Sequence, residues 1–337
     1  MNSSFDIKKF SKKLIFFGLP IILVVFGYFI FDPFQILYTY DSYPDDYAKS
    51  LNRDRISTQM YLNGKEKYNY NSFIFGSSRS SVFYAKDWAK FINEPYPYHF
   101  DASCETISGI ANKLKFIDKN GSKIKNALIV IDIGTFEYEQ DTLGAIFVQD
   151  YRASGLPWYK YHLIFFNSYF SNAFFLRYFD YKLFGKFRPY MNGFLEHRFI
   201  SYTPINNDFI FTSYEDDLKK MGEEKYYQQP FFYERDSSAK ISKPIIQAYQ
   251  LKFLGEIKSV LDKHQTDYKI VIGPMYNQLK FNPKDIEILE NQFGKRNIYD
   301  YSGVNEFTKD KRNYYEIYHY RPQVARQIMS RIYTKKP

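Results

Sequence analysis

One run in the middle of the chain, "ALIVIDI" (127–133), limits the possible folds more than any other feature. Its residues are apolar without alternation and largely β-branched, which is typical of a strand that is buried on both faces of a parallel sheet. Comparable strand-like runs follow Asn71, namely "SFIF" (72–75), "YPYHF" (96–100), "YKIVIG" (268–273) and "NIYDY" (297–301).

Stretches with helical spacing separate these runs, near 105–118, 242–263, 283–293 and 320–333. This alternation predicts an α/β fold, a flavodoxin-like three-layer sandwich with a central parallel sheet of about five strands and helices on both faces. This alternation of strands and helices is interrupted between about 140 and 240, which predicts an insertion with helices of its own that caps one end of the sheet. Within it, "YHLIFFNSYFSNAFFLRYF" (161–179) is interrupted by Asn, Ser and Arg, so we expect an amphipathic or buried helix there.

The N-terminal region contains eighteen residues without a charge, Leu14 to Phe31. As a helix this run is roughly 27 Å long, close to the hydrocarbon thickness of a bilayer. A cleaved signal peptide and a buried core helix are the other interpretations. The run is followed by "FDPFQILY" rather than by a small-residue cleavage site, which favours an uncleaved anchor.

Four lysines before this run predict that the N-terminus lies in the cytoplasm and that the rest of the chain lies outside the cytoplasmic membrane. We therefore expect a cytoplasmic tail over 1–13, a single transmembrane anchor over 14–31 and a membrane-proximal segment over 32–70. A folded extracytoplasmic or periplasmic domain is expected over 71–337.

Composition excludes several classes of protein. Aromatic residues make up 21% of the chain, which excludes disorder, and a lone Cys104 excludes an intrachain disulfide and a cysteine-based metal site. The N-terminal lysines and Asp6 supply +3 of the net charge of +9, and no basic run is interleaved with aromatics. We therefore expect no nucleic-acid partner, and no metal or cofactor.

The stretch "FIFGSSRSSVF" (73–83) combines a strand, a glycine turn and the predicted start of a helix. Ser77 and Ser78 then occupy the carboxyl end of a strand, where parallel sheets bind their ligands. A serine at this corner has an exposed Oγ, and the N-terminus of the helix can stabilise an oxyanion. The ordinary alternative for a Gly-Ser-Ser turn is a helix cap.

A candidate base lies near the C-terminus, in "NYYEIYHYRPQVARQI" (313–328). Glu316 precedes His319 by three residues, so its carboxylate can accept from the imidazole Nδ1–H and leave Nε2 to take a proton from a serine. An ion pair on a helix surface is the alternative. The other histidines show no comparable carboxylate partner in the sequence (His99, His162, His197 and His264).

Taken together, these motifs resemble the SGNH (GDSL-type) hydrolases, and among them the membrane-anchored envelope proteins similar to DltD and the alginate O-acetylation proteins. The resemblance covers residues 71–333 except the insertion. "FIFGSSRS" matches the first block of the family, in which the nucleophile would be Ser78. "YEIYHY" matches the last block, with Glu316 in place of the usual aspartate before His319.

The middle blocks of the family match less closely. In "YHFDASCETISGI" (98–110) the resemblance implies that Ser103 donates its backbone N–H to the oxyanion. In "IDIGTFEYE" (131–139), Phe136 stands where the family has an asparagine, and Thr135 is the substitute donor that we consider. Two further residues have alternative roles: Arg79 binds an anionic or sugar group or is solvated, and Asp300 is structural or replaces Glu316.

The resemblance implies a serine esterase or O-acyltransferase with a Ser-His-Glu triad that acts on a cell-envelope polysaccharide or glycoconjugate, alongside a multispanning O-acyltransferase. The alternative is a non-catalytic membrane-tethered scaffold or glycan-binding protein with a degenerate site, which Phe136 favours. Aromatic residues of the insertion either stack on sugar rings or pack in the core (Trp158, Tyr159 and Tyr161).

Overall fold

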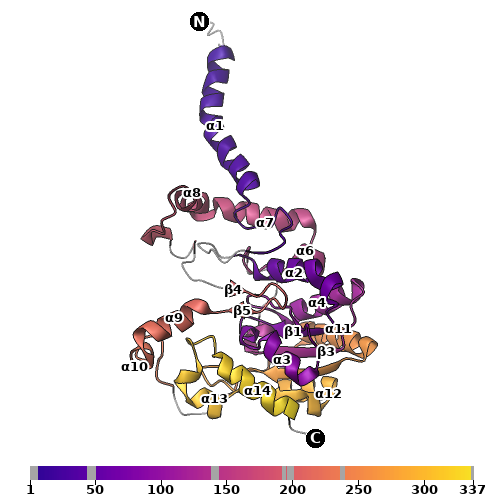
Figure 1. Ribbon diagram of the computed structural model, residues 1–337. Helices are drawn as coiled ribbons and strands as arrows, with labels where there is room; N and C mark the ends of the chain where they lie inside the picture. The colour runs from indigo at the N-terminus through magenta and orange to yellow at the C-terminus, as the bar shows by residue number, and fades with distance from the viewer. Residues whose placement is uncertain are drawn as a thin grey trace.

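A computed structural model describes residues 7–43, 51–137, 144–191, 195, 201–235 and 240–334. An N-terminal helix projects from the body of the molecule, two helices of the insertion lie across its base, and the sheet with its covering helices lies beyond them (Figure 1).

The central sheet has five strands, all parallel, in the order β2-β1-β3-β6-β7. They are β1 (Ser72–Gly76), β2 (Tyr98–His99), β3 (Asn126–Ile131), β6 (Asp267–Ile272) and β7 (Ile298–Asp300). Taken in chain order this is 2-1-3-4-5, the flavodoxin-like order, so the predicted fold class is confirmed. The edge strand β2 is shorter than its sequence run because Pro97 has no N–H to donate to a ladder.

Helices cover both faces of this sheet. Side chains alternate along β3, so that Ile129 and Ile131 enter one core cluster and Leu128 and Val130 enter the other. The first cluster includes residues of α4 (Ile107–Lys119), α11 (Ala248–His264) and α12 (Pro283–Phe293), and the second includes residues of α3 (Ala85–Ile92), α13 (Glu306–Lys309) and α14 (Pro322–Thr334).

A further helix, α2 (Arg53–Tyr68), lies in the segment that was expected to be membrane-proximal. Its side chains Ile56, Met60 and Tyr61 belong to the first core cluster, and most of the helix is buried. Its first turn is charged and buried. We therefore find that part of the 32–70 segment is built into the core of the folded domain.

The insertion contributes two sets of elements. The first set is α6 (Tyr151–Ser154), α7 (Trp158–Phe170), a 3₁₀ turn (Ser171–Ala173) and α8 (Phe174–Phe184). The single helix predicted over 161–179 is split because Asn172 and Ala173 adopt positive φ angles of 49° and 55°. The second set is a small antiparallel pair, β4 (Ser201–Tyr202) and β5 (Phe209–Ile210), followed by α9 (Thr212–Met221) and α10 (Glu223–Tyr226).

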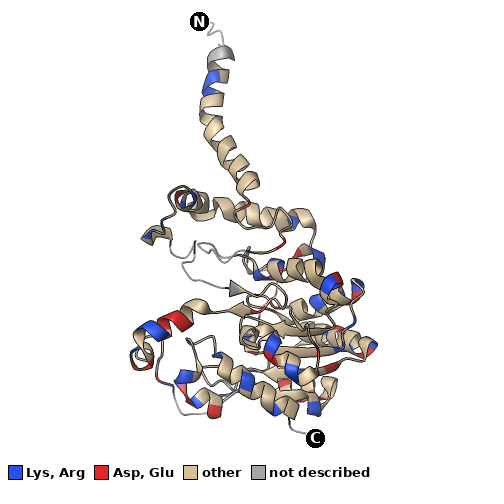
Figure 2. Cartoon of the chain, in the orientation of Figure 1, with Lys and Arg blue, Asp and Glu red and all other residues tan. Residues whose placement is uncertain are grey.

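The N-terminal helix α1 (Ile7–Phe31) is the one helix in the described part of the chain that is long and apolar enough to cross a membrane. Figure 2 shows basic residues, coloured blue, near the start of α1 and no charged residue along the rest of its length. This is compatible with a single-pass anchor.

Candidate active site

The turn that carries Ser78 begins at the carboxyl end of β1. Gly76 adopts a φ of +152°, and a Cβ atom at this position would lie 2.5 Å from the carbonyl oxygen of Val130, so the turn requires glycine. A short 3₁₀ helix (Ser80–Val82) follows, and α3 begins only at Ala85. The expectation that a helix starts directly at Ser78 is therefore wrong.

The three residues proposed as a triad meet at this turn. The Oγ of Ser78 lies 2.8 Å from Nε2 of His319, although the two residues are 241 positions apart. The Nδ1 of His319 is hydrogen-bonded to Oε1 of Glu316, whose Oε2 accepts from the backbone N–H of Tyr318 at 2.9 Å. This is the serine, base and orienting carboxylate arrangement of a nucleophilic hydrolase.

The imidazole is held but not sealed. The His319 side chain is 19% exposed and that of Glu316 is 13% exposed. The ring of Phe211, which follows β5 of the insertion, packs 4.9 Å from the His319 ring. Ser78, Glu316 and His319 are therefore all partly accessible to solvent, while the insertion supplies one apolar wall beside His319.

Arg79 connects this turn to two other elements. Its guanidinium pairs with Asp132 after β3 at 2.7 Å and donates to the carbonyl oxygen of Tyr318 at 3.2 Å. Burial alone would lower the pKa of Arg79, but the Asp132 carboxylate outweighs it and holds the pKa above its usual value. The expected roles, binding an anion or remaining solvated, do not fit a cation that is already neutralised at 18% exposure.

The candidate oxyanion donors differ in their placement. The loop after β2 lies beside the serine turn because the N–H of Ala102 donates to the carbonyl oxygen of Gly76 at 3.3 Å, which brings Ser103 near the site. Thr135 is buried, and its hydroxyl accepts from the N–H of Asp132 at 3.1 Å. Phe136 is a core residue packed against Phe281. Thr135 is therefore engaged within its own turn and Phe136 within the core.

A second chain of polar contacts, which the sequence did not predict, lies directly beneath the serine turn. The Oγ of Ser80 donates to the carbonyl oxygen of Ser77 at 2.7 Å and lies 3.0 Å from Nε2 of His99. The Nδ1 of His99 lies 3.3 Å from Oδ1 of Asp208, which also accepts from the N–H of Ala85. The side chains of Ser80, His99 and Asp208 are all buried. We call these three residues the brace, because they support the turn from the interior of the protein, where a substrate cannot reach them.

Nothing local in the sequence predicts this brace, because Asp208 comes from the insertion, 109 positions after His99. His264 likewise finds a carboxylate across the fold, 2.8 Å from Asp118. His162 lies in α7, and His197 lies outside the described residues. Asp300 pairs with Lys280 and accepts from the N–H of Ser302, so its role is structural.

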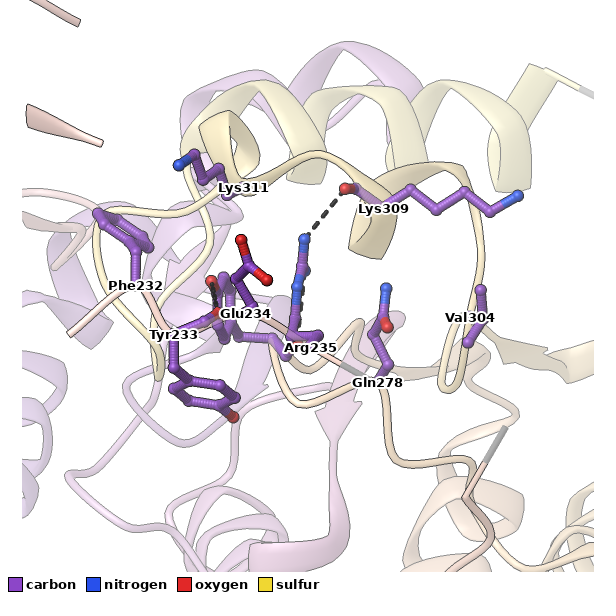
Figure 3. Close-up of a pocket in the computed structure, with 9 residues that line it drawn as sticks. Phe232, Tyr233, Glu234, Arg235, Gln278, Val304, Lys309 and Lys311 are labelled. Atoms are coloured by element: carbon purple, nitrogen blue, oxygen red, sulfur yellow. Dashed lines mark hydrogen bonds between the residues drawn. The ribbon is translucent and has the colours of Figure 1, made fainter. Parts of the chain in front are cut away.

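A separate cleft of about 650 Å³ lies between the end of the insertion and the loops after β6 and β7 (Figure 3). Arg235 enters it, donates to the carbonyl oxygen of Lys309 at 3.0 Å and lies 4.3 Å from the centre of the Tyr276 ring. Ser78 and His319 do not line this cleft. The guanidinium of Arg235 in this cleft is therefore already bound by groups of the protein.

A comparison of the sequence with family models found no match, and a search of curated proteins found none either. Membership of the SGNH hydrolases therefore stays a prediction, which rests on the short motifs around Ser78 and His319.

Proposed function

We propose that this protein is a serine-dependent acyl-transfer enzyme. The observation that carries the proposal is the hydrogen-bonded line from Ser78 through His319 to Glu316 at the carboxyl edge of the sheet. Ser78 and the Arg79 partner Asp132 follow β1 and β3, the neighbouring strands at which the strand order reverses. Ligands of open parallel sheets bind at this switch point.

The proposed reaction has two halves. The Ser78 oxygen attacks the ester carbonyl carbon while its proton passes to Nε2 of His319, and the tetrahedral oxyanion accepts hydrogen bonds from backbone N–H groups, with those of Ser78 and Ser103 as candidates. The C–O bond to the leaving alcohol then breaks, and His319 protonates that alcohol. Water or a sugar hydroxyl attacks the acyl-serine, gives its proton to His319 and restores Ser78.

The substrate class follows from the resemblance and from the candidate anchor. We infer an ester of a cell-envelope polysaccharide or glycoconjugate, on the outer side of the cytoplasmic membrane, and a multispanning O-acyltransferase as partner. The N-terminal lysines support this orientation because positive residues are retained in the cytoplasm.

A second candidate function is a tethered glycan-binding or scaffold protein. Phe136 favours it, because a core phenylalanine replaces a donor of the oxyanion hole, and loss of such a donor costs ~3 kcal/mol of transition-state stabilisation. The intact triad geometry favours the enzyme.

Labelling of the full-length protein with a fluorophosphonate probe tests the proposal. Trypsin cleavage after Arg79 separates Ser78, in the peptide of residues 68–79, from Ser80 and Ser81, in the peptide of residues 80–86. We expect the adduct in the first peptide, assigned to Ser78 by fragmentation, and its loss in Ser78→Ala and His319→Ala.

The buried brace provides the matched control. Ser80→Ala removes a hydroxyl that also contacts a histidine, yet this hydroxyl is buried, so the adduct on Ser78 should remain. An adduct on Ser80, or equal labelling of wild type, Ser78→Ala and His319→Ala, would contradict the triad. Lack of label in a folded wild type, together with no hydrolysis of acetylated glycans, would favour the scaffold.

A further inference from the structure

The two long helices of the insertion expose an unusual amount of apolar surface. Leu163 on α7 is 53% exposed, and Leu183 on α8 is 75% exposed. Other large apolar side chains of these helices and their flanks are also exposed: Trp158, Tyr159, Phe170, Leu176, Phe184 and Tyr190. Contiguous exposed apolar surface of this kind marks an interaction site.

Four apolar side chains of α7, three exposed and one half-buried, form one stripe. Tyr159, Leu163, Phe166 and Phe170 are spaced by four, three and four positions, so they lie on the same side of the helix. Its third member contacts the N-terminal helix, because the ring centre of Phe166 lies 5.2 Å from that of Tyr28 and 6.4 Å from that of Phe29. The exposed members therefore point in the direction from which α1 arrives.

The same pattern recurs on α8. Leu176, Phe179 and Leu183 are spaced by three and four positions, and the middle member again contacts α1, with Phe179 packed 5.6 Å from Phe31. Gly27 permits this contact, since a Cβ atom there would lie 2.5 Å from the Phe179 ring. Both stripes thus flank the last turns of α1.

This position matches the outer edge of the hydrocarbon layer. The apolar run of α1 ends at Phe31, and α7 and α8 lie across that end, with the sheet on their other side (Figure 1). The hydroxyl of Tyr169 in α7 donates to the carbonyl oxygen of Val24 at 3.0 Å, which fixes the two helices to each other. Helices at this level lie in the plane of the interface.

The charge of the segment fits anionic headgroups. Residues 158–190 contain five Lys and Arg and one acidic residue, Asp180, so this segment carries +4 of the net charge of +9. Lys160, Lys182 and Lys186 are exposed. Basic residues beside an apolar stripe are the signature of a helix that binds a lipid surface.

We propose that α7 and α8 form a membrane platform, defined by the stripes 159–170 and 176–183, which inserts into the outer interface of the bilayer that α1 crosses. The occupant of these apolar faces is therefore lipid. This inference goes beyond the proposed catalytic function and depends only on α1 being an anchor.

Depth-dependent quenching in nanodiscs tests the platform with the full-length chain. In a Cys104→Ser background, single cysteines at Leu163 and Leu183 carry an environment-sensitive fluorophore, and matched labels at Ile15 in α1 and at Lys252 on α11 serve as references. Nanodiscs contain phosphatidylcholine and phosphatidylglycerol, with a spin label either near the headgroup or near the end of the acyl chain.

We expect the fluorophores at positions 163 and 183 to show blue-shifted emission. The spin label near the headgroup should quench this emission more strongly than the spin label near the end of the acyl chain. Quenching at 15 and none at 252 are the reference results. Emission at 163 and 183 that matches the 252 label, while the 15 label is quenched, would overturn the platform and leave the anchor intact. No quenching at 15 would overturn both, and neither result bears on the labelling of Ser78.

Discussion

At the scale of single residues, Glu316 shows how one side chain can fix the geometry of a site. Both of its oxygens are engaged, one with Nδ1 of His319 and one with the N–H of Tyr318. The carboxylate therefore holds the imidazole ring with Nε2 directed at Ser78 and would stabilise the imidazolium formed during proton transfer.

Substitution of this carboxylate separates charge from shape. Glu316→Gln keeps the size but loses the charge and can stabilise the wrong tautomer, so kcat should fall by ~10³–10⁴. Glu316→Asp keeps the charge and should retain more activity than Glu316→Gln. Hydrolysis of an activated ester measures both variants, and wild-type turnover by Glu316→Gln would contradict the role of this residue.

In the proposed enzyme Arg79 would act as a positioning residue, because it contacts both Asp132 and the loop that carries His319. Arg79→Met should lower kcat while KM changes little, and Arg79→Lys should restore part of the loss. Asp132→Asn should have a smaller effect, because it leaves the contact of Arg79 with the Tyr318 carbonyl, and the double variant should be no worse than Arg79→Met alone. Additive losses in kcat, measured on the same ester, would show that the pair does not act as a unit.

At the scale of elements, the buried strands were predictable because their signal is local. The continuous apolar run of β3 and the turn after β1 can each be recognised within a few residues of sequence. The pairing of Ser78 with His319 was predicted from the serine at a strand end and the Glu-x-x-His motif before the last helix. The start of α3 was not predictable in this way, since the tertiary contact of the Ala85 N–H with Asp208 fixes it. The brace under Ser80 and the helix α2 depend on partners far along the chain.

The first turn of α2 explains why that helix escaped prediction. Arg53, Asp54 and Arg55 suggest a solvated surface, yet all three are buried and paired across the fold. Arg53 binds Asp101 at 2.7 Å and Asn207 at 2.9 Å, and Arg55 binds Asp150 at 3.1 Å. These charged residues can therefore be buried only because elements far along the chain supply the opposite charges.

Removal of one member of the buried Arg53–Asp101 pair should lower the stability of the fold, because the other charge stays buried. Arg53→Met leaves the Asp101 carboxylate buried without its cation, which should lower the free energy of unfolding by ~3–5 kcal/mol. Lys252→Met, at an exposed helix position, should change it by less than ~0.5 kcal/mol. Denaturant unfolding of the solubilised full chain compares the two, and equal midpoints would show that the Arg53 pair contributes nothing.

At the scale of the whole molecule, a single insertion connects the apolar helix α1 with the candidate site. Its first half forms α7 and α8 against α1, and its second half delivers Asp208 to the brace and Phe211 to the face of His319. Charged residues are spread over the body around the sheet, whereas α1 has none after Lys13 (Figure 2). The insertion is therefore the element that contacts both α1 and the candidate site.

Buried carboxyl groups make the stability of this body depend on pH in two opposite ways. Burial alone would raise the pKa of Asp101, but Arg53 and His99 outweigh it, so the folded-state pKa lies below the ordinary value of 3.8. This group stabilises the fold above its unfolded pKa, and the contribution is lost as the pH falls through the folded pKa. Asp150, beside Arg152 and Arg55, behaves in the same way.

Glu105 acts in the opposite direction. Burial raises its pKa from 4.5 to about 7, with Asp54 adding to the rise and Lys113 opposing it. The folded state therefore holds a proton that the unfolded chain releases, so this contribution is complete below pH 4.5 and is lost as the pH rises toward about 7. The glutamine side chain in Glu105→Gln cannot ionise, so the variant should not show this loss of stability with rising pH.

The melting temperatures of wild type and Glu105→Gln, followed by intrinsic fluorescence, should consequently differ by an amount that depends on pH. Between about pH 5 and about pH 8 the wild type should lose stability relative to the variant, and above that range the difference should be constant. A difference that is the same at about pH 5 and at about pH 8 would show that Glu105 is ionised in the folded state throughout this range, with Lys113 neutralising it alone.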